Sequence, residues 1–200
     1  KIHDTGLEGW NNKRLIDPVK KIVSIGQTDE EIKNVISNFS PDIVAVSVLF
    51  SNLLESAHNI ANLAKKVNKN ILVMLGGNHI SGSLTDYKFA LVDQNSNLPD
   101  FIPELENENI DLAMIGEAEH SFLELINALA NKKDISKIPG LVKKIGNKKY
   151  IINPPKRIHD LNILPRPARH LSNMEGYFDI GAFHSPKSKS HRVLSVMCSR

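Results

Sequence analysis

The chain has 200 residues, 41% of them hydrophobic and 24% charged, which suits one domain with an appendage and a well-buried core. A formal net charge of +3 and the lack of a long Lys/Arg run argue against nucleic acid as a partner, and no apolar stretch has the length of a membrane span or signal peptide. A single cysteine, Cys198, excludes a disulfide framework and favours a cytoplasmic protein.

Strands and helices are predicted to alternate in the first half of the chain. Thr28 and Glu31 form a capping box at the start of a helix whose apolar residues recur at helical spacing. The predicted elements are a strand over 22–26, a helix over 29–39, a strand over 42–49, a helix over 53–67 and a strand over 71–75.

The second half continues this alternation and then changes character. A weak helix is predicted over 84–93, a polar loop over 94–109, a strand over 111–116 and a helix over 119–130. A hairpin follows over 141–152, because two short apolar runs flank a Gly-Asn turn. Residues 153–190 are rich in Pro, His and Arg without periodicity and indicate an extended linker, and residues 191–200 open a new strand.

This order predicts an α/β fold with a flavodoxin-like, doubly wound parallel sheet. In such sheets ligands bind beyond the carboxyl ends of the strands. The strand Ile71–Leu75 ends in Gly76 and Gly77, which leave the backbone without a side-chain wall, so that a ligand can lie against the main chain. The sequence therefore places its most informative candidate site at these two glycines.

Two short motifs at neighbouring strand ends carry a resemblance. Ser47-x-Leu49, followed by Gly76-Gly77, resembles the Ser-x-Leu and Gly-Gly pair of cobalamin-binding domains. In that family the nucleotide tail of the cofactor enters at the sheet edge, the serine hydroxyl meets the tail base, and the glycines leave room for the tail. The resemblance implies that Gly77→Val blocks the tail while leaving the sheet largely intact.

Further motifs in the same order make the resemblance more specific. Gly76-Gly77-Asn78-His79-Ile80-Ser81, then Gly116-Glu117-Ala118-Glu119, then Ile138-Pro139-Gly140-Leu141 resemble the cobalamin-binding half of class B radical S-adenosylmethionine (SAM) proteins. Asn153–Pro155 and Asp160–Arg169 resemble the linker of those proteins, and Val196–Arg200 resembles the first strand of their barrel.

The resemblance implies a cofactor site and a division into domains. Cobalamin-binding residues would be Ser47, Leu49, Ser51, Gly76, Gly77, His79, Ser81, Gly116, Glu117 and Glu119. Read from the residues alone, His79 is as often a hydrogen-bonding cap, and the helix macrodipole most simply explains two acids at a helix N-terminus. Residues 1–140 would form the cobalamin-binding domain, 141–190 a hairpin and linker, and 191–200 the start of a radical SAM barrel.

The N-terminus departs from one branch of the family. Domains of the methionine synthase type carry Asp-x-His-x-x-Gly, whose histidine binds cobalt, whereas Asp4–Gly9 fits that frame with Gly6 at the histidine position. The alternative, which we favour, is that Lys1–Asp4 ends the second strand and that the first strand lies upstream of a cut. Under either interpretation this frame offers cobalt no histidine.

The three cysteines of a radical SAM cluster are not in the chain, since Cys198 stands alone, just before the expected first ligand. We expect a part of a longer cobalamin-dependent radical SAM enzyme, with the ligands of its four-iron cluster and of SAM beyond residue 200. Methyl transfer or related radical chemistry is implied for the intact protein, and no catalysis for this part alone. The alternative is a non-catalytic cobalamin sensor or flavodoxin-like regulatory module. The sequence does not indicate the substrate.

Overall fold

The computed structural model of the chain describes residues 2–17, 19, 22–84, 102–146, 149–180, 190 and 192–193. The chain divides into two compact units. One comprises Ile32–Leu164 and holds all of the predicted site residues, and the other comprises Lys1–Glu31 together with Pro165–Arg200.

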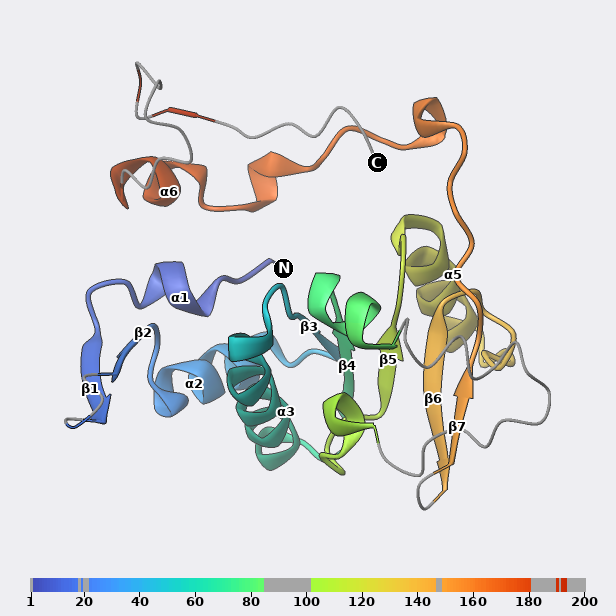
Figure 1. The fold of residues 1–200 in the computed structure, drawn as a ribbon, viewed down its shortest axis with the longest axis horizontal. Coiled ribbons are helices and arrows are strands. Elements are labelled where there is room, and N and C mark those ends of the chain that lie inside the picture. The colour runs from blue at the N-terminus through green and yellow to red at the C-terminus, as the bar shows by residue number, and fades with distance from the viewer. Residues whose placement is uncertain are drawn as a thin grey trace. The chain divides into compact units, whose positions relative to one another are not determined.

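A five-stranded sheet forms the centre of the unit Ile32–Leu164 (Figure 1). β3, β4 and β5 are parallel, whereas β6 is antiparallel to both of its neighbours. The predicted α/β fold is confirmed, but the prediction of an entirely parallel sheet is wrong, because the sheet is mixed. The strands, in spatial order, are β3 (Ile43–Ser47), β4 (Leu72–Gly76), β5 (Leu112–Met114), β6 (Leu141–Gly146) and β7 (Lys149–Ile152).

A backbone contact at the start of β6 explains the change of direction. The Ile115 N–H donates a hydrogen bond to the carbonyl of Gly140 at 2.9 Å, and Met114 pairs with Leu141. The chain therefore enters β6 beside the carboxyl end of β5 and runs back along it, so no crossover connection is needed. The predicted hairpin is confirmed and belongs to this sheet, while a domain boundary at residue 140 stays a prediction.

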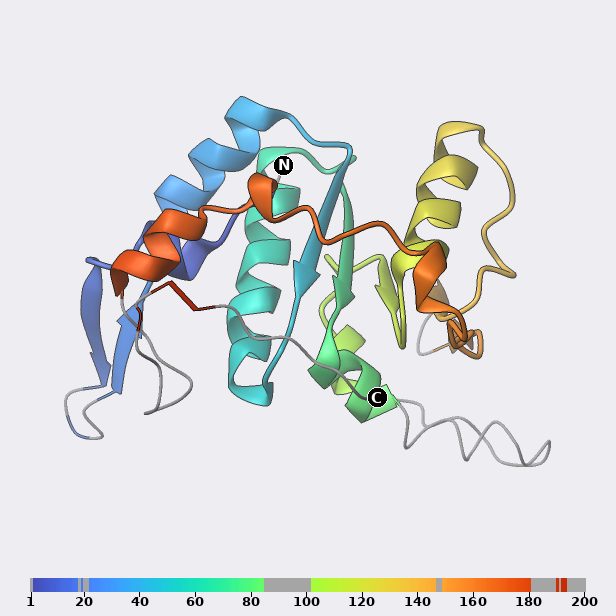
Figure 2. The ribbon, with the colours of Figure 1, turned by 90° about the horizontal axis from the view of Figure 1, so that it is seen from above.

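Different helices cover the two faces of the sheet (Figure 2). Alternate residues of β4 point to opposite faces, as the pleat requires. Val73 and Leu75 pack in one core with α2 (Asp29–Phe39) and α3 (Leu54–Val67). Met74 lies in a second core with residues of α5 (Glu119–Ala130). The sheet is therefore buried on both faces along β4, which explains the continuous apolar run in its sequence.

The helices that flank the predicted site begin and end close to where the sequence predicts. α2 and α5 have the predicted bounds, and α3 follows the short 3₁₀ helix η1 (Ser51–Leu53). The capping box is confirmed: the Thr28 N–H donates to the Glu31 carboxylate at 2.7 Å, and the Glu31 N–H donates to the Thr28 hydroxyl at 3.3 Å. Hydrogen bonds from the backbone and side chain of Thr28 lower the pKa of Glu31.

The second unit contains a small hairpin instead of strands of the main sheet. β1 (Lys13–Asp17) pairs antiparallel with β2 (Ile22–Ile25), so the strand predicted over 22–26 is confirmed but lies outside the parallel set. The prediction that a strand ends at Asp4 is wrong. The Asp4 carboxylate caps the one-turn helix α1 (Thr5–Glu8) by accepting hydrogen bonds from two backbone N–H groups at 2.9 Å.

Asp4 also joins the two sequence ends of this unit. Tyr177, on α6 (Met174–Ile180), donates its hydroxyl hydrogen to the second oxygen of the Asp4 carboxylate. Burial, together with this hydrogen bond, raises the pKa of Tyr177 to about 12. Residues 153–173 follow the predicted extended course, with short 3₁₀ turns η3 (Leu161–Ile163) and η4 (Arg169–Leu171), whereas the helix α6 was not predicted.

Parts of three predictions fall on residues outside the described ones. The helix predicted over 84–93 begins earlier, since residues 78–84 are helical, and 85–93 lie outside the described residues. Of the predicted loop, residues 102–109 are described and include η2 (Pro103–Leu105). Of the strand predicted over 191–200, only Arg192 and Val193 are described, and neither lies in a strand. Among the described helices, none is long and apolar enough to cross a membrane.

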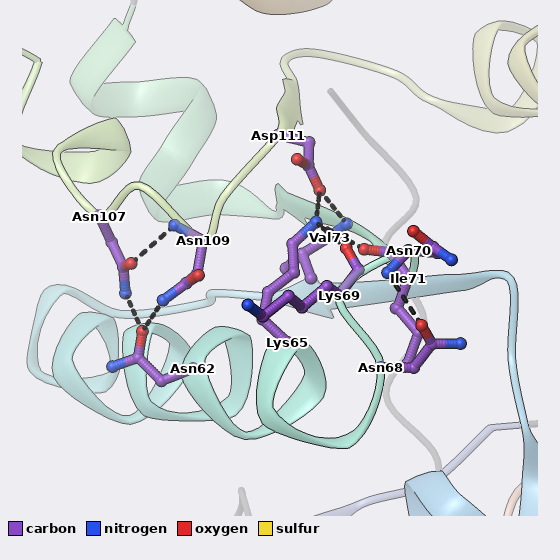
Figure 3. A network of polar contacts seen from close by, with 10 residues as sticks. All are labelled: Asn62, Lys65, Asn68, Lys69, Asn70, Ile71, Val73, Asn107, Asn109 and Asp111. Atoms are coloured by element: carbon purple, nitrogen blue, oxygen red, sulfur yellow. Dashed lines mark hydrogen bonds and ion pairs between the residues drawn. The ribbon is translucent and has the colours of Figure 1, made fainter.

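A polar network fixes α3 to the amino ends of β4 and β5 (Figure 3). The Lys65 ammonium donates to the Asp111 carboxylate and to the Ile71 carbonyl, both at 2.7 Å. The same Asp111 oxygen accepts the Val73 N–H at 2.7 Å. Lys65, Ile71 and Asp111 border a cleft of about 670 Å³ at the end of the sheet opposite to the predicted site. Since the Lys65 cation is already paired inside the fold, we assign this network to stability.

We predict that Asp111→Ala lowers the free energy of unfolding by about 1–3 kcal/mol, because it leaves the Val73 N–H and the Lys65 ammonium without their acceptor. Urea unfolding followed by circular dichroism measures this change. The control is Asp42→Ala, since the exposed Asp42 carboxylate makes no hydrogen bond or ion pair within the described residues. Equal unfolding free energies for the two variants would contradict this role of Asp111.

Candidate functional site

The carboxyl ends of β3, β4 and β5 bring the predicted site residues together. Ser47, the last residue of β3, pairs with Gly76, the last residue of β4. Leu75 pairs with Ala113, so the loop that contains Gly116 leaves the sheet at the same edge. Parallel pairing thus joins three loops that are far apart in the sequence, as the strand-end argument predicts.

The backbone of Gly77 packs directly against the loop after β3. The Val48 N–H donates to the Gly76 carbonyl at 2.8 Å, and the His79 N–H donates to the Val48 carbonyl at 3.0 Å. Gly77 has φ +99°, and a Cβ there would lie 2.7 Å from the Val48 carbonyl oxygen. A side chain at Gly77 therefore collides with backbone, and the conformation itself disfavours one.

This contact corrects the expectation for Gly77→Val. The substitution would strain Gly77 and push Val48 away, so it would disturb the sheet edge itself as well as any ligand. Gly76 differs, because a Cβ there would meet only the Met114 carbonyl oxygen at 3.6 Å, an ordinary van der Waals distance. Gly76 is therefore the glycine whose substitution tests ligand access without breaking the fold.

Apolar side chains are exposed on the loop after β3. Leu49 is 51% exposed, Phe50 62% and Leu53 41%, although each lies within a few residues of the fully buried Val48. Ser47 and Ser51 are exposed in the same segment. The loop thus presents apolar surface interspersed with hydroxyl groups, a composition typical of a ligand-binding surface.

His79 lies in the first turn of the helix that follows Gly77, and its ring points into the protein. Its Nδ1 is 3.2 Å from the Ser51 hydroxyl and 3.3 Å from the Ser83 hydroxyl. Its Nε2 is 3.8 Å from the Glu104 carboxylate, and the two side chains are only 14% and 9% exposed. His79 therefore joins the loop after β3, its own helix and η2.

Ser81 and Gly116 connect the second and third loops of the site. The Ser81 hydroxyl accepts the Gly116 N–H at 3.0 Å. Gly116 has φ +77°, and a Cβ there would lie 2.6 Å from the Cβ of Pro155. The start of the linker therefore passes directly against Gly116, an approach that only glycine allows.

The two predicted acids differ in their surroundings. The Glu117 carboxylate accepts the backbone N–H of Ile158 at 2.6 Å, so this acid ties the linker to the end of β5. Glu119 begins α5 with an exposed side chain. Asn153 adds to the attachment, because its side-chain amide donates to the carbonyls of Ser136 and Ile138 at 2.8 Å.

The sequence missed several residues of this arrangement. Glu104 and Ser83 contact His79 but belong to no motif, and Phe50 gives no sequence signal of its exposure. Ile158 could not be predicted, because it takes part through its backbone N–H, which nearly every residue type has. In the described part of the chain, no group of three or more His, Cys, Asp or Glu side chains is placed to hold a metal ion.

Comparison with known proteins agrees with the cobalamin-domain motifs at Ser47 and Gly76-Gly77. The model of the B12 binding domain family matches residues 19–94, a range that includes the loops after β3 and β4. Cytidylyl-2-hydroxyethylphosphonate methyltransferase of Streptomyces wedmorensis is 26% identical to this chain. The alignment covers 100% of this chain and 38% of the relative. The uncharacterized methyltransferase PH0819 of Pyrococcus horikoshii is 31% identical to this chain. The alignment covers 75% of this chain and 29% of the relative. The chain thus spans well under half the length of these relatives.

Solved structures with weaker similarity carry related descriptions. The radical SAM methyltransferase TsrM from Kitasatospora setae matches 64% of this chain with a TM-score of 0.43 and 20% identity, and 22% of that protein is covered. The cobalamin-dependent SAM radical enzyme OxsB matches 66% of this chain with a TM-score of 0.46 and 19% identity, and 16% of it is covered. Residues 19–94 of the chain thus match the B12 binding domain family, and the chain is similar to two proteins described as methyltransferases.

Proposed function

We propose that the chain binds cobalamin at the carboxyl ends of β3, β4 and β5, as the cofactor-binding part of a cobalamin-dependent radical SAM methyltransferase. The observation that carries this proposal is the overlap between the B12-binding match over 19–94 and the joined loops that contain Ser47 and Gly76. The methyltransferase names of both curated relatives support methyl transfer as the reaction of the intact protein.

The residues at this sheet edge fit a large cofactor with an apolar ring face and polar substituents. Leu49, Phe50 and Leu53 supply exposed apolar area for a flat ring system, and burial of such area is the main source of binding free energy. Gly76 has no side chain, and the nearest atom to a Cβ placed there would be the Met114 carbonyl oxygen, at 3.6 Å. A narrow group such as a nucleotide tail could lie there.

The predicted site residues other than Ser51, Gly77 and His79 then have roles that their surroundings support. Ser47 and Gly76 would bind the nucleotide tail, Leu49 would cover the corrin ring and exclude water, and Ser81 and Gly116 would hold the third loop in place. Bound cobalamin would supply a cobalt atom able to carry a methyl group. Glu117, which already accepts the Ile158 N–H, would fix the linker beside the cofactor, and the exposed Glu119 remains open to polar cofactor groups.

The radical half of the reaction is proposed from the resemblance and the relatives. A four-iron four-sulfur cluster and SAM would belong to the intact protein, with ligands beyond residue 200 and a barrel that begins near residue 191. We further propose a flavodoxin-like cobalamin domain over 1–140 and a following segment over 141–190, whose hairpin adds β6 and β7 to the sheet of that domain and whose remainder is the linker. A non-catalytic cobalamin sensor is the competing function, and cobalamin binding without SAM cleavage by the intact protein would favour it.

Gly76→Val should weaken cobalamin binding by at least about tenfold, because its two methyl groups would occupy the space proposed for the tail. The matched control is Gly82→Val, since a Cβ at Gly82 on the neighbouring helix meets no atom within 4 Å. Equilibrium dialysis with cobalamin gives the dissociation constants, and circular dichroism melts check that both variants fold. Unchanged affinity in a folded Gly76→Val variant would remove the tail from this position.

Bound cobalamin should have no protein imidazole on cobalt, because Gly6 occupies the histidine position of the only matching frame. Electron paramagnetic resonance of the Co(II) form, in protein labelled with ¹⁵N-histidine, tests this expectation. Nitrogen splitting into a doublet would identify a histidine ligand and contradict the expectation. A triplet would instead come from the ¹⁴N of a retained tail base.

A further inference from the structure

We infer that His79 is a positioning residue, which holds the cobalamin-binding loop after β3 through Ser51 and does not itself contact the cofactor. The effect on cobalamin binding rests on the proposed function, whereas the placement of His79 rests on contacts within the protein. It replaces the direct cofactor contact that the resemblance implies for His79.

Both ring nitrogens of His79 are directed at groups inside the protein. The Nε2 atom is buried and lies 3.8 Å from the Glu104 carboxylate, beyond direct hydrogen-bond distance. A carboxylate at this position favours a proton on Nε2, because a bare ring nitrogen facing it would be repelled. Nδ1 can then accept a hydrogen bond from the Ser51 hydroxyl at 3.2 Å.

The Ser83 hydroxyl is the other neighbour of Nδ1. It donates to the His79 carbonyl at 2.9 Å, one helical turn back, and therefore has no second hydrogen to offer Nδ1. Of the two hydroxyls near Nδ1, that of Ser51 is the one free to donate. The imidazole, with its proton on Nε2, thus accepts a hydrogen bond at Nδ1 from Ser51 in the loop after β3.

η2 provides the fixed end of this connection. The His58 ring donates to the Glu104 carbonyl at 3.2 Å, which attaches η2 to α3. The Lys144 ammonium donates to the Leu105 carbonyl at 3.2 Å, which attaches η2 to β6. Glu104 is therefore held from two sides, and the His79 ring that packs beside it has a defined place.

The loop after β3 is the part that needs such support. Its apolar side chains Leu49 and Phe50 are more than half exposed, so packing does little to hold them. Within the described residues, the Ser51–His79 contact is the only hydrogen bond made by a side chain of the segment 48–53. Fixing this segment before cobalamin arrives would reduce the entropy lost on binding.

The test compares Ser51→Ala, His79→Ala and the double variant in the 200-residue chain. Hydrogen–deuterium exchange of the protein without cobalamin should be faster over residues 48–53 in all three variants. Cobalamin dissociation constants should rise by between about twofold and tenfold, the effect of losing one neutral hydrogen bond. The double variant should equal the single ones, because both remove the same contact.

The matched controls are Ser37→Ala and His120→Ala, whose exposed side chains lie on α2 and α5 away from this contact. Wild-type exchange over 48–53 in Ser51→Ala overturns the inference, and so does a loss of binding that occurs in His79→Ala alone. Ser51→Ala changes an exposed residue, so it keeps the test decisive even if His79→Ala fails to fold. If wild-type protein does not bind cobalamin while the exchange results hold, only the proposed function fails.

Discussion

The site depends on the backbone contact between Val48 and the Gly76-Gly77 pair. Two hydrogen bonds, from the Val48 N–H to Gly76 and from the His79 N–H to Val48, continue the β3–β4 ladder past the last paired residues. This continuation is possible only because Gly77 has no Cβ and adopts a positive φ. The contact turns the chain after each strand and thereby places Ser47, Leu49 and His79 around one edge of the sheet.

The glycine pair therefore has two separate functions that its sequence does not distinguish. Gly77 is required by the fold, whereas Gly76 leaves space that the fold does not use. The same division applies to the acids, since Glu117 is engaged by the linker backbone and Glu119 is exposed. Residues of one motif can thus either stabilise the fold or remain available to a ligand, and only the contacts of each residue show which of these it does.

The sequence was sufficient for features set by local patterns. The capping box predicts the start of α2, and helical spacing predicts α5. Apolar runs followed by Ser47, Gly76 and Gly116 predict three strand ends at one edge. It was insufficient where a distant contact decides the outcome. The mixed sheet follows from the bond between Ile115 and Gly140, and the use of Glu117 follows from Ile158, 41 residues away.

The most direct test of the central claim is hydrogen–deuterium exchange of the wild-type chain with and without cobalamin. The account predicts protection at the loops after β3 and β4 and near Gly116, with no change at the opposite end, where Lys65 and Asp111 border the cleft. Protection confined to that cleft, or no protection anywhere, would contradict it.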